Sequence, residues 1–134
     1  MTVQLVWDNT DKKILRFDIS ETWTWDDFFA AKTESYDLIN RVPHKVGVVI
    51  HISTRTALSA NLLSNTRKAL SDKHPNISAI VVVVTDTLAR TAVNLLYDSI
   101  RFGSMRIEIV ASLDEARRII EQRQQEQSAM PDHK

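Results

Sequence analysis

The sequence predicts an α/β fold in which helices pack on a single-layer mixed sheet of about five strands. Two nearly continuous apolar runs, 45–52 and 78–84, have the length and β-branched content of buried strands. Each run is followed by a stretch in which apolar residues recur at helical spacing. Alternation of strands and helices is typical of sheets covered by helices, and the whole chain predicts the order ββαβαβαβα.

The chain opens with two short strand patterns, at 3–7 and 14–19. In the second, Leu15, Phe17 and Ile19 alternate with Arg16 and Asp18, which is the period of a strand with one buried face. The polar link between the two patterns suits a hairpin turn. Because a hairpin joins antiparallel strands, we expect a mixed sheet rather than a wholly parallel one.

Helical spacing begins after this hairpin. Thr24 and Asp27 have the separation of a capping box, and Pro43 is expected to end the helix. The residues expected on its inner face are Trp25, Phe28, Phe29, Lys32, Tyr36 and Ile39.

The rest of the chain predicts three strand–helix units. The runs 45–52 and 78–84 indicate parallel strands buried on both faces. Helices are expected after each of them, the second capped by Asp86 or Thr87 and ending near Gly103. The final unit pairs an edge strand at 105–111 with a helix. In the edge strand, Met105, Ile107 and Ile109 should lie on one side. Ser112 and Glu115 should form a capping box at the start of the helix. The residues expected on the inner face of this helix are Leu113, Ala116, Ile119 and Ile120.

Composition restricts the function classes. The 134 residues fit one domain, expected at 1–122, followed by a polar tail at 123–134 that we expect to be disordered. Lys and Arg together number 17, as do Asp and Glu, so no global positive field favours nucleic acid. There is no cysteine for a disulfide or a thiolate metal site. The longest apolar run is too short to span a membrane, and no signal-peptide pattern is present, so we expect a cytoplasmic protein.

Several site chemistries lack their residues in this sequence. The two glycines form no phosphate-binding loop, so we expect no nucleotide cofactor. His44 and His51 are an odd number of residues apart and should point to opposite faces of their strand, which predicts no metal site. A hydrolase built on Ser53 and His51 is the weakest candidate, because no acid is fixed nearby in the sequence and the G-x-S-x-G turn is absent.

The hydroxyl-rich segment after the run 45–52 is the main candidate site. Ser53, Thr54, Arg55 and Thr56 should lie at the carboxyl end of a central strand, where α/β sheets bind their ligands. The simpler interpretation of these residues is that they form an ordinary helix start. A second candidate is the aromatic concentration around Trp23, which also suits simple core packing.

The element order, together with the stretch "VVIHISTRTALSANLL" at 48–63, resembles the STAS domain, the SpoIIAA-like fold of bacterial anti-sigma-factor antagonists. The resemblance covers Val3 to about Gln122. It implies a non-enzymatic regulatory module that binds a protein partner, with a phosphorylated serine in an aspartate–serine–(serine or threonine)–glycine turn. Ser53 is the nearest match to that serine. The aspartate and the glycine of the turn have no counterpart, because Ile52 and Arg55 stand at their places.

The same resemblance extends to the CRAL-TRIO lipid-transfer domains, which implies a groove for an apolar small molecule as the alternative function. The residues expected to line such a groove are Trp23, Leu88, Leu95, Leu96 and Tyr97. An exposed last strand would also allow a homodimer.

Overall fold

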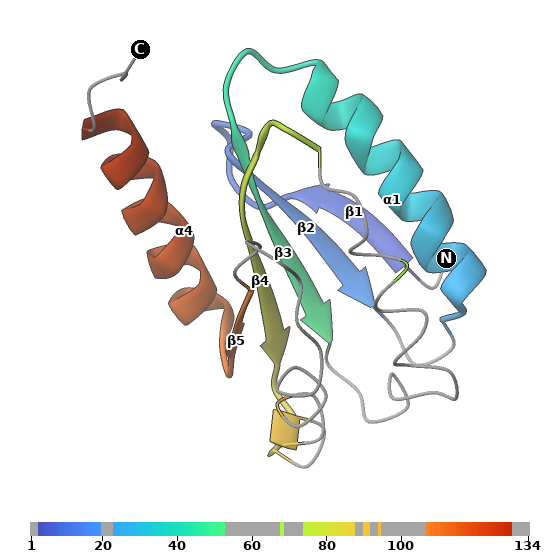
Figure 1. Cartoon of the computed structure of the whole chain (residues 1–134). Coiled ribbons are helices and arrows are strands. Elements are labelled where there is room, and N and C mark those ends of the chain that lie inside the picture. Colours follow the sequence, from blue (N-terminus) through green and yellow to red (C-terminus); the bar gives the residue numbers. More distant parts are fainter. Residues whose placement is uncertain are drawn as a thin grey trace.

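The computed structural model describes residues 3–19, 23–52, 68, 74–87, 90–91, 94 and 107–129. Within these residues, five strands form one sheet in the order β1-β2-β3-β4-β5, accompanied by two helices (Figure 1). The elements are β1 (Val3–Trp7), β2 (Ile14–Ile19), α1 (Trp25–Asn40), β3 (Val46–Ile52), β4 (Ile77–Val84), β5 (Ile107–Val110) and α4 (Leu113–Ala129).

The sheet is mixed, as the opening hairpin predicts. β1 and β2 are antiparallel, with Val3 opposite Ile19 and Trp7 opposite Leu15. The pairs β2–β3, β3–β4 and β4–β5 are all parallel. The predictions for the two opening strands and for parallel central strands are therefore confirmed.

Alternation along the strands divides the core between the two faces of the sheet. Leu15 and Phe17 of β2 pack in the cluster that includes Phe28 and Ile39 of α1. Ile14 of the same strand packs in the cluster of α4. Figure 1 shows the two helices on either side of the strands. β3 and β4 are rich in β-branched residues because they contribute to both clusters.

Helix α1 begins with the predicted capping box. The Thr24 hydroxyl accepts the Asp27 backbone N–H at 3.1 Å, and the Asp27 carboxylate accepts the Thr24 backbone N–H at 3.1 Å. The buried residues of the helix are Phe28, Ala31, Ser35 and Ile39. Phe28 and Ile39 were predicted on this face, and the predicted Trp25, Phe29 and Tyr36 pack partly buried against the same core cluster, whereas Ala31 and Ser35 were not predicted.

The side chains of Trp25, Phe29, Lys32 and Tyr36 are only half-buried and flank that stripe. The small side chains of Ala31 and Ser35 occupy the line of closest approach to the sheet. The Ser35 hydroxyl donates to the Lys32 carbonyl at 2.6 Å, which satisfies the one buried polar side chain of this stripe.

Helix α4 starts as predicted and extends further. The Ser112 hydroxyl accepts a hydrogen bond from the Glu115 backbone N–H at 3.2 Å. The Glu115 carboxylate accepts a hydrogen bond from the Ser112 hydroxyl, and not from the Ser112 backbone N–H as a capping box requires. Ala116 and Ile120 are fully buried.

The segment from 123, expected to be a disordered tail, is helical as far as Ala129. Two contacts hold its first turn: Arg123 binds Glu108 at 2.9 Å, and the Gln124 amide donates to the Lys13 carbonyl at 3.1 Å.

The last strand is described from Ile107 to Val110. β5 pairs only with β4, which confirms it as an edge strand within the described sheet. Ile107 is buried against the α1 cluster and Val110 against the α4 cluster, while Ile109 is half-buried. Both faces of β5 therefore contribute to the core, rather than the single side that alternation predicted. Met105 and Gly103 lie outside the described residues.

The helices predicted after β3 and β4 fall largely outside the described residues. The start of the second one is visible. The Arg90 backbone N–H donates to the Asp86 carbonyl at 2.9 Å, which is a helical hydrogen bond that places Asp86 at the N-cap.

Gly47 of β3 lies directly beneath Ile120 of α4. A Cβ atom added at this position would overlap with Cγ2 of Ile120, a stiff β-branched side chain on a helix. The absence of a side chain at Gly47 therefore sets how closely α4 approaches the sheet.

We predict that Gly47→Ala lowers the free energy of unfolding by about 1–3 kcal/mol, the usual effect of overpacking a core. Chemical denaturation measures it. In an Ile120→Ala background the same change should have a much smaller effect, because the overlapping atom is gone. Equal losses in the two backgrounds would contradict this account.

Candidate functional site

The carboxyl ends of the three neighbouring parallel strands meet at one edge of the sheet. Ile52, the last residue of β3, pairs with Ile19 of β2 on one side and with Val84 of β4 on the other. The predicted segment Ser53, Thr54, Arg55 and Thr56 lies outside the described residues. Since Ser53 directly follows Ile52, the segment begins at the middle of this edge.

Next to this point, three polar side chains share the sheet face on which α4 packs. Arg16 and Asp18 alternate with the buried Leu15 and Phe17 along β2, and His51 lies opposite Asp18 on β3. Helix α4 contacts mainly β4 and leaves this part of the face partly open. The side chains of Arg16, Asp18 and His51 are 22%, 30% and 22% exposed.

Direct hydrogen bonds join these three side chains. The Arg16 guanidinium donates to both oxygens of Asp18, at 2.8 and 3.1 Å. The His51 Nδ1 atom lies 3.2 Å from Asp18 Oδ1. A carboxylate is only an acceptor, so a neutral His51 must carry its proton on Nδ1 to make this bond. Its Nε2 atom then presents a lone pair, and no partner for Nε2 is found among the described residues.

Asp8, at the start of the hairpin turn, extends this network through a hydrogen bond with Arg16. Its side chain is only 3% exposed. It accepts hydrogen bonds from Arg16 Nη1 at 2.6 Å and from Arg117 Nε and Nη2 at 2.7 and 3.0 Å. One carboxylate therefore connects the hairpin to helix α4, which lies more than a hundred residues later in the chain.

These contacts shift the ionisation of the network. Hydrogen bonding from Arg117 holds the pKa of Asp8 below its ordinary value of 3.8, although burial acts in the opposite direction. Hydrogen bonding to Asp18 raises the pKa of Arg16, and hydrogen bonding to Asp8 raises the pKa of Arg117. The three groups are therefore firmly charged, and their orientation is preset by their partners.

Sequence reasoning missed this network. It noted His51 but found no acid for it, and it assigned Arg16 and Asp18 to the exposed face of a strand. The parallel register of β2 and β3 brings Asp18 to His51, and only the approach of α4 brings Arg117 to Asp8. The alternation of charged residues within β2 was the one available signal.

The aromatic residues near α1 pack against the core, which suits the simpler interpretation of the aromatic concentration. Trp23 and Trp25 lie 4.7 Å apart between ring centroids, and both pack with Phe29 against the α1 cluster. Trp23 is half-buried. The other residues predicted to line an apolar groove lie outside the described residues, so that groove stays a prediction. They are Leu88, Leu95, Leu96 and Tyr97.

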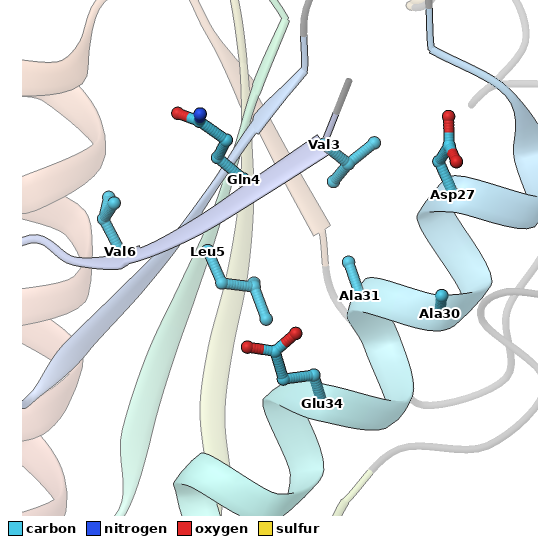
Figure 2. Close-up of a pocket in the computed structure, with 8 residues that line it drawn as sticks. All are labelled: Val3, Gln4, Leu5, Val6, Asp27, Ala30, Ala31 and Glu34. Atoms are coloured by element: carbon cyan, nitrogen blue, oxygen red, sulfur yellow. The ribbon is translucent and has the colours of Figure 1, made fainter. Parts of the chain in front are cut away.

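A different groove lies between β1 and α1, with a volume of about 620 Å³ (Figure 2). It is open to solvent and lined by Val3, Gln4, Leu5, Val6, Asp27, Ala30, Ala31 and Glu34.

Among the described residues, no group of three or more metal-binding side chains occurs. In the same part of the chain, no helix combines the length and the apolar character needed to cross a membrane.

Comparison of the chain with protein-family models, with curated proteins and with solved structures found no match.

We predict that Asp8→Asn lowers the free energy of unfolding by about 2 kcal/mol at neutral pH, because two arginines lose a charged partner. Arg117 is 37% exposed, so solvent screening keeps the loss below that of a fully buried pair.

The pH dependence of this loss has a definite sign. The folded-state pKa of Asp8 is lowered, so its stabilisation is present above pH 3.8 and disappears as the pH falls through that lowered pKa. Denaturation of wild type and Asp8→Asn across acidic pH measures the difference. A difference that grows on acidification would contradict the assignment.

Proposed function

We propose that the chain is a non-enzymatic, STAS-like regulatory module that binds a protein partner at the carboxyl edge of its sheet. The contact surface comprises Ser53, Thr54, Arg55, Thr56 and the helix expected after them. Two facts support the STAS-like assignment. The sheet is mixed with an antiparallel opening pair, and α1 connects β2 to the parallel strand β3, both as that resemblance implies.

The observation that carries the binding proposal is the half-exposed Arg16–Asp18–His51 network beside Ile52. Its hydrogen bonds hold charged groups in place before any partner arrives. Preset charges at an interface contribute specificity, because a mismatched partner leaves them without compensation. The hydroxyl-rich segment adds donors and acceptors at the same edge.

Arg55 supports recognition through contact rather than through a phosphorylation turn. It stands where the resemblance places a glycine, and no aspartate precedes Ser53. A guanidinium binds a carboxylate through two parallel hydrogen bonds. The surface therefore suits a partner with an acidic group at the centre of its interface.

Site-specific photocrosslinking in cells tests this proposal. A photoreactive residue at position 54 should crosslink to one defined protein, and Ser53→Ala with Arg55→Ala should reduce that product several-fold, since each change removes polar contacts at the interface. A photoreactive residue at the exposed Thr33 of α1 is the matched control. Equal products from positions 54 and 33, or none from position 54, would contradict the proposal.

A hydrolase is the second candidate, favoured by the Asp18–His51 contact. Asp18 supplies the acid that the sequence left unidentified, and it leaves Nε2 of His51 pointing away from the carboxylate. This is the orientation of an acid–base pair, with Ser53 two residues along the chain. It ranks second because Arg16 already binds both oxygens of Asp18, which weakens their support for a protonated imidazole.

We expect the purified protein to hydrolyse activated esters and phosphate esters at the background rate, with Ser53→Ala and His51→Gln indistinguishable from wild type. A release assay with p-nitrophenyl acetate and p-nitrophenyl phosphate measures it. Turnover that both substitutions abolish, with the fold retained by circular dichroism, would replace the binding proposal with the catalytic one.

A further inference from the structure

Within the described part of the chain, no strand pairs with the outer edge of β1. β1 is the first strand of the described sheet and pairs only with β2. The Asp8 backbone N–H donates to the Ile14 carbonyl at 2.8 Å, so residues at even positions face β2 with their backbone groups. In an antiparallel ladder, the alternate residues face the opposite way. The backbone N–H and C=O groups of Val3, Leu5 and Trp7 therefore point outward.

This edge carries none of the usual protection against a further strand. Natural edge strands are blocked by charged side chains, proline or a bulge. The sequence of β1, Val-Gln-Leu-Val-Trp, contains no charge and no proline, and its register with β2 is regular. At the other edge of the described sheet, β5 carries Glu108, which binds Arg123 of α4. The β1 edge is thus the unguarded one.

The groove between β1 and α1 has room for an added strand. Ala30 and Ala31 present only methyl groups, so α1 does not fill the space beside the strand. Figure 2 shows the Glu34 carboxylate next to Leu5, and Asp27 toward the Val3 end. The groove therefore has a backbone edge on one side and carboxylates on the other.

The negative charge of α1 indicates which kind of segment the groove would bind. At helical periodicity, Asp26, Asp27, Glu34 and Asp37 share the side of α1 that carries Ala30, and Arg41 at the C-cap is the one basic residue that projects to this side. The side keeps an excess of negative charge. Pairing β1 with β1 of a second copy would place two such acidic helices on the same face of one continuous sheet. Like charges in that position repel, so the groove favours a basic segment over a second copy.

We propose that this groove binds an extended, basic segment of a partner protein, which adds to β1 as an antiparallel strand. Its backbone pairs with Val3, Leu5 and Trp7. In antiparallel pairing, opposed side chains lie on the same face, so the residues that bond to β1 also face α1. Lysine or arginine at every second position then faces the exposed Glu34. This surface is separate from the carboxyl edge of the sheet, so this proposal does not depend on the proposed function.

The probe is an amidated octapeptide of alternating lysine and threonine with an N-terminal fluorescein, into which the full chain is titrated while fluorescence anisotropy is followed. Glu34→Gln should weaken binding about tenfold, the effect of losing one charge-assisted contact. Ala30→Lys should weaken it further and Ala30→Glu should strengthen it. Both positions are exposed on α1, so thermal unfolding is expected to stay unchanged.

Two controls separate the groove from general attraction to acidic protein. Glu121→Gln removes an exposed carboxylate from α4 and should leave binding unchanged. The peptide of alternating glutamate and threonine should not bind.

N-methylation of the probe tests strand addition itself. Methylation of the lysine nitrogens removes the N–H groups that face β1 and should abolish binding, whereas methylation of the threonine nitrogens should preserve it. Equal binding of the two methylated peptides, or an equal effect of Glu34→Gln and Glu121→Gln, would overturn the proposal.

Discussion

The parallel alignment of β2, β3 and β4 is the constraint on which the rest of this structure depends. It requires β3 and β4 to be buried on both faces, which is why α1 and α4 must lie on opposite sides of the sheet. It also brings the ends of the three strands to one edge. Asp18 meets His51 there, and the hydroxyl-rich segment leaves from the centre of that edge.

A buried carboxylate joins the two ends of the chain. Asp8 is almost fully enclosed and is stable as a charge only because Arg16 and Arg117 bind it together. Through Arg117 the hairpin is held against α4, and through Arg16 the same charge network reaches Asp18 and His51. The edge of β1 that pairs with β2 is thus fixed within the folded sheet. The outer edge of β1, with which no strand of the described sheet pairs, lies beside an acidic helix, which makes the two edges of the sheet chemically different.

Local patterns in the sequence predicted the elements well where one segment determines its own structure. The strands 3–7 and 14–19 and the cap at Thr24 follow from alternation and capping chemistry within a few residues. Predictions failed where distant segments decide. The prediction for α1 omitted Ala31 and Ser35, whose small side chains are buried. The final helix continues past 123 because Arg123 finds Glu108 and Gln124 finds the Lys13 carbonyl.

The candidate site shows the same division. The carboxyl edge formed by β2, β3 and β4 follows from strand order, which sequence patterns supply. The ionic network does not, because Asp8 and Arg117 are 109 residues apart and their contact depends on how α4 packs. The groove beside β1 depends on two alanines whose small size carries no functional signal in the sequence.

The tautomer of His51 tests most directly the claim that parallel register orients a side chain for recognition at this edge. Long-range ¹H–¹⁵N correlation on the neutral imidazole distinguishes its two nitrogens. The account predicts that His51 carries its proton on Nδ1 and that the backbones of Asp18 and His51 are in contact. In Asp18→Asn, the asparagine amide group can donate to Nδ1, and the proton should then move to Nε2. A proton on Nε2 in the wild-type protein, or strands out of this register, would contradict it.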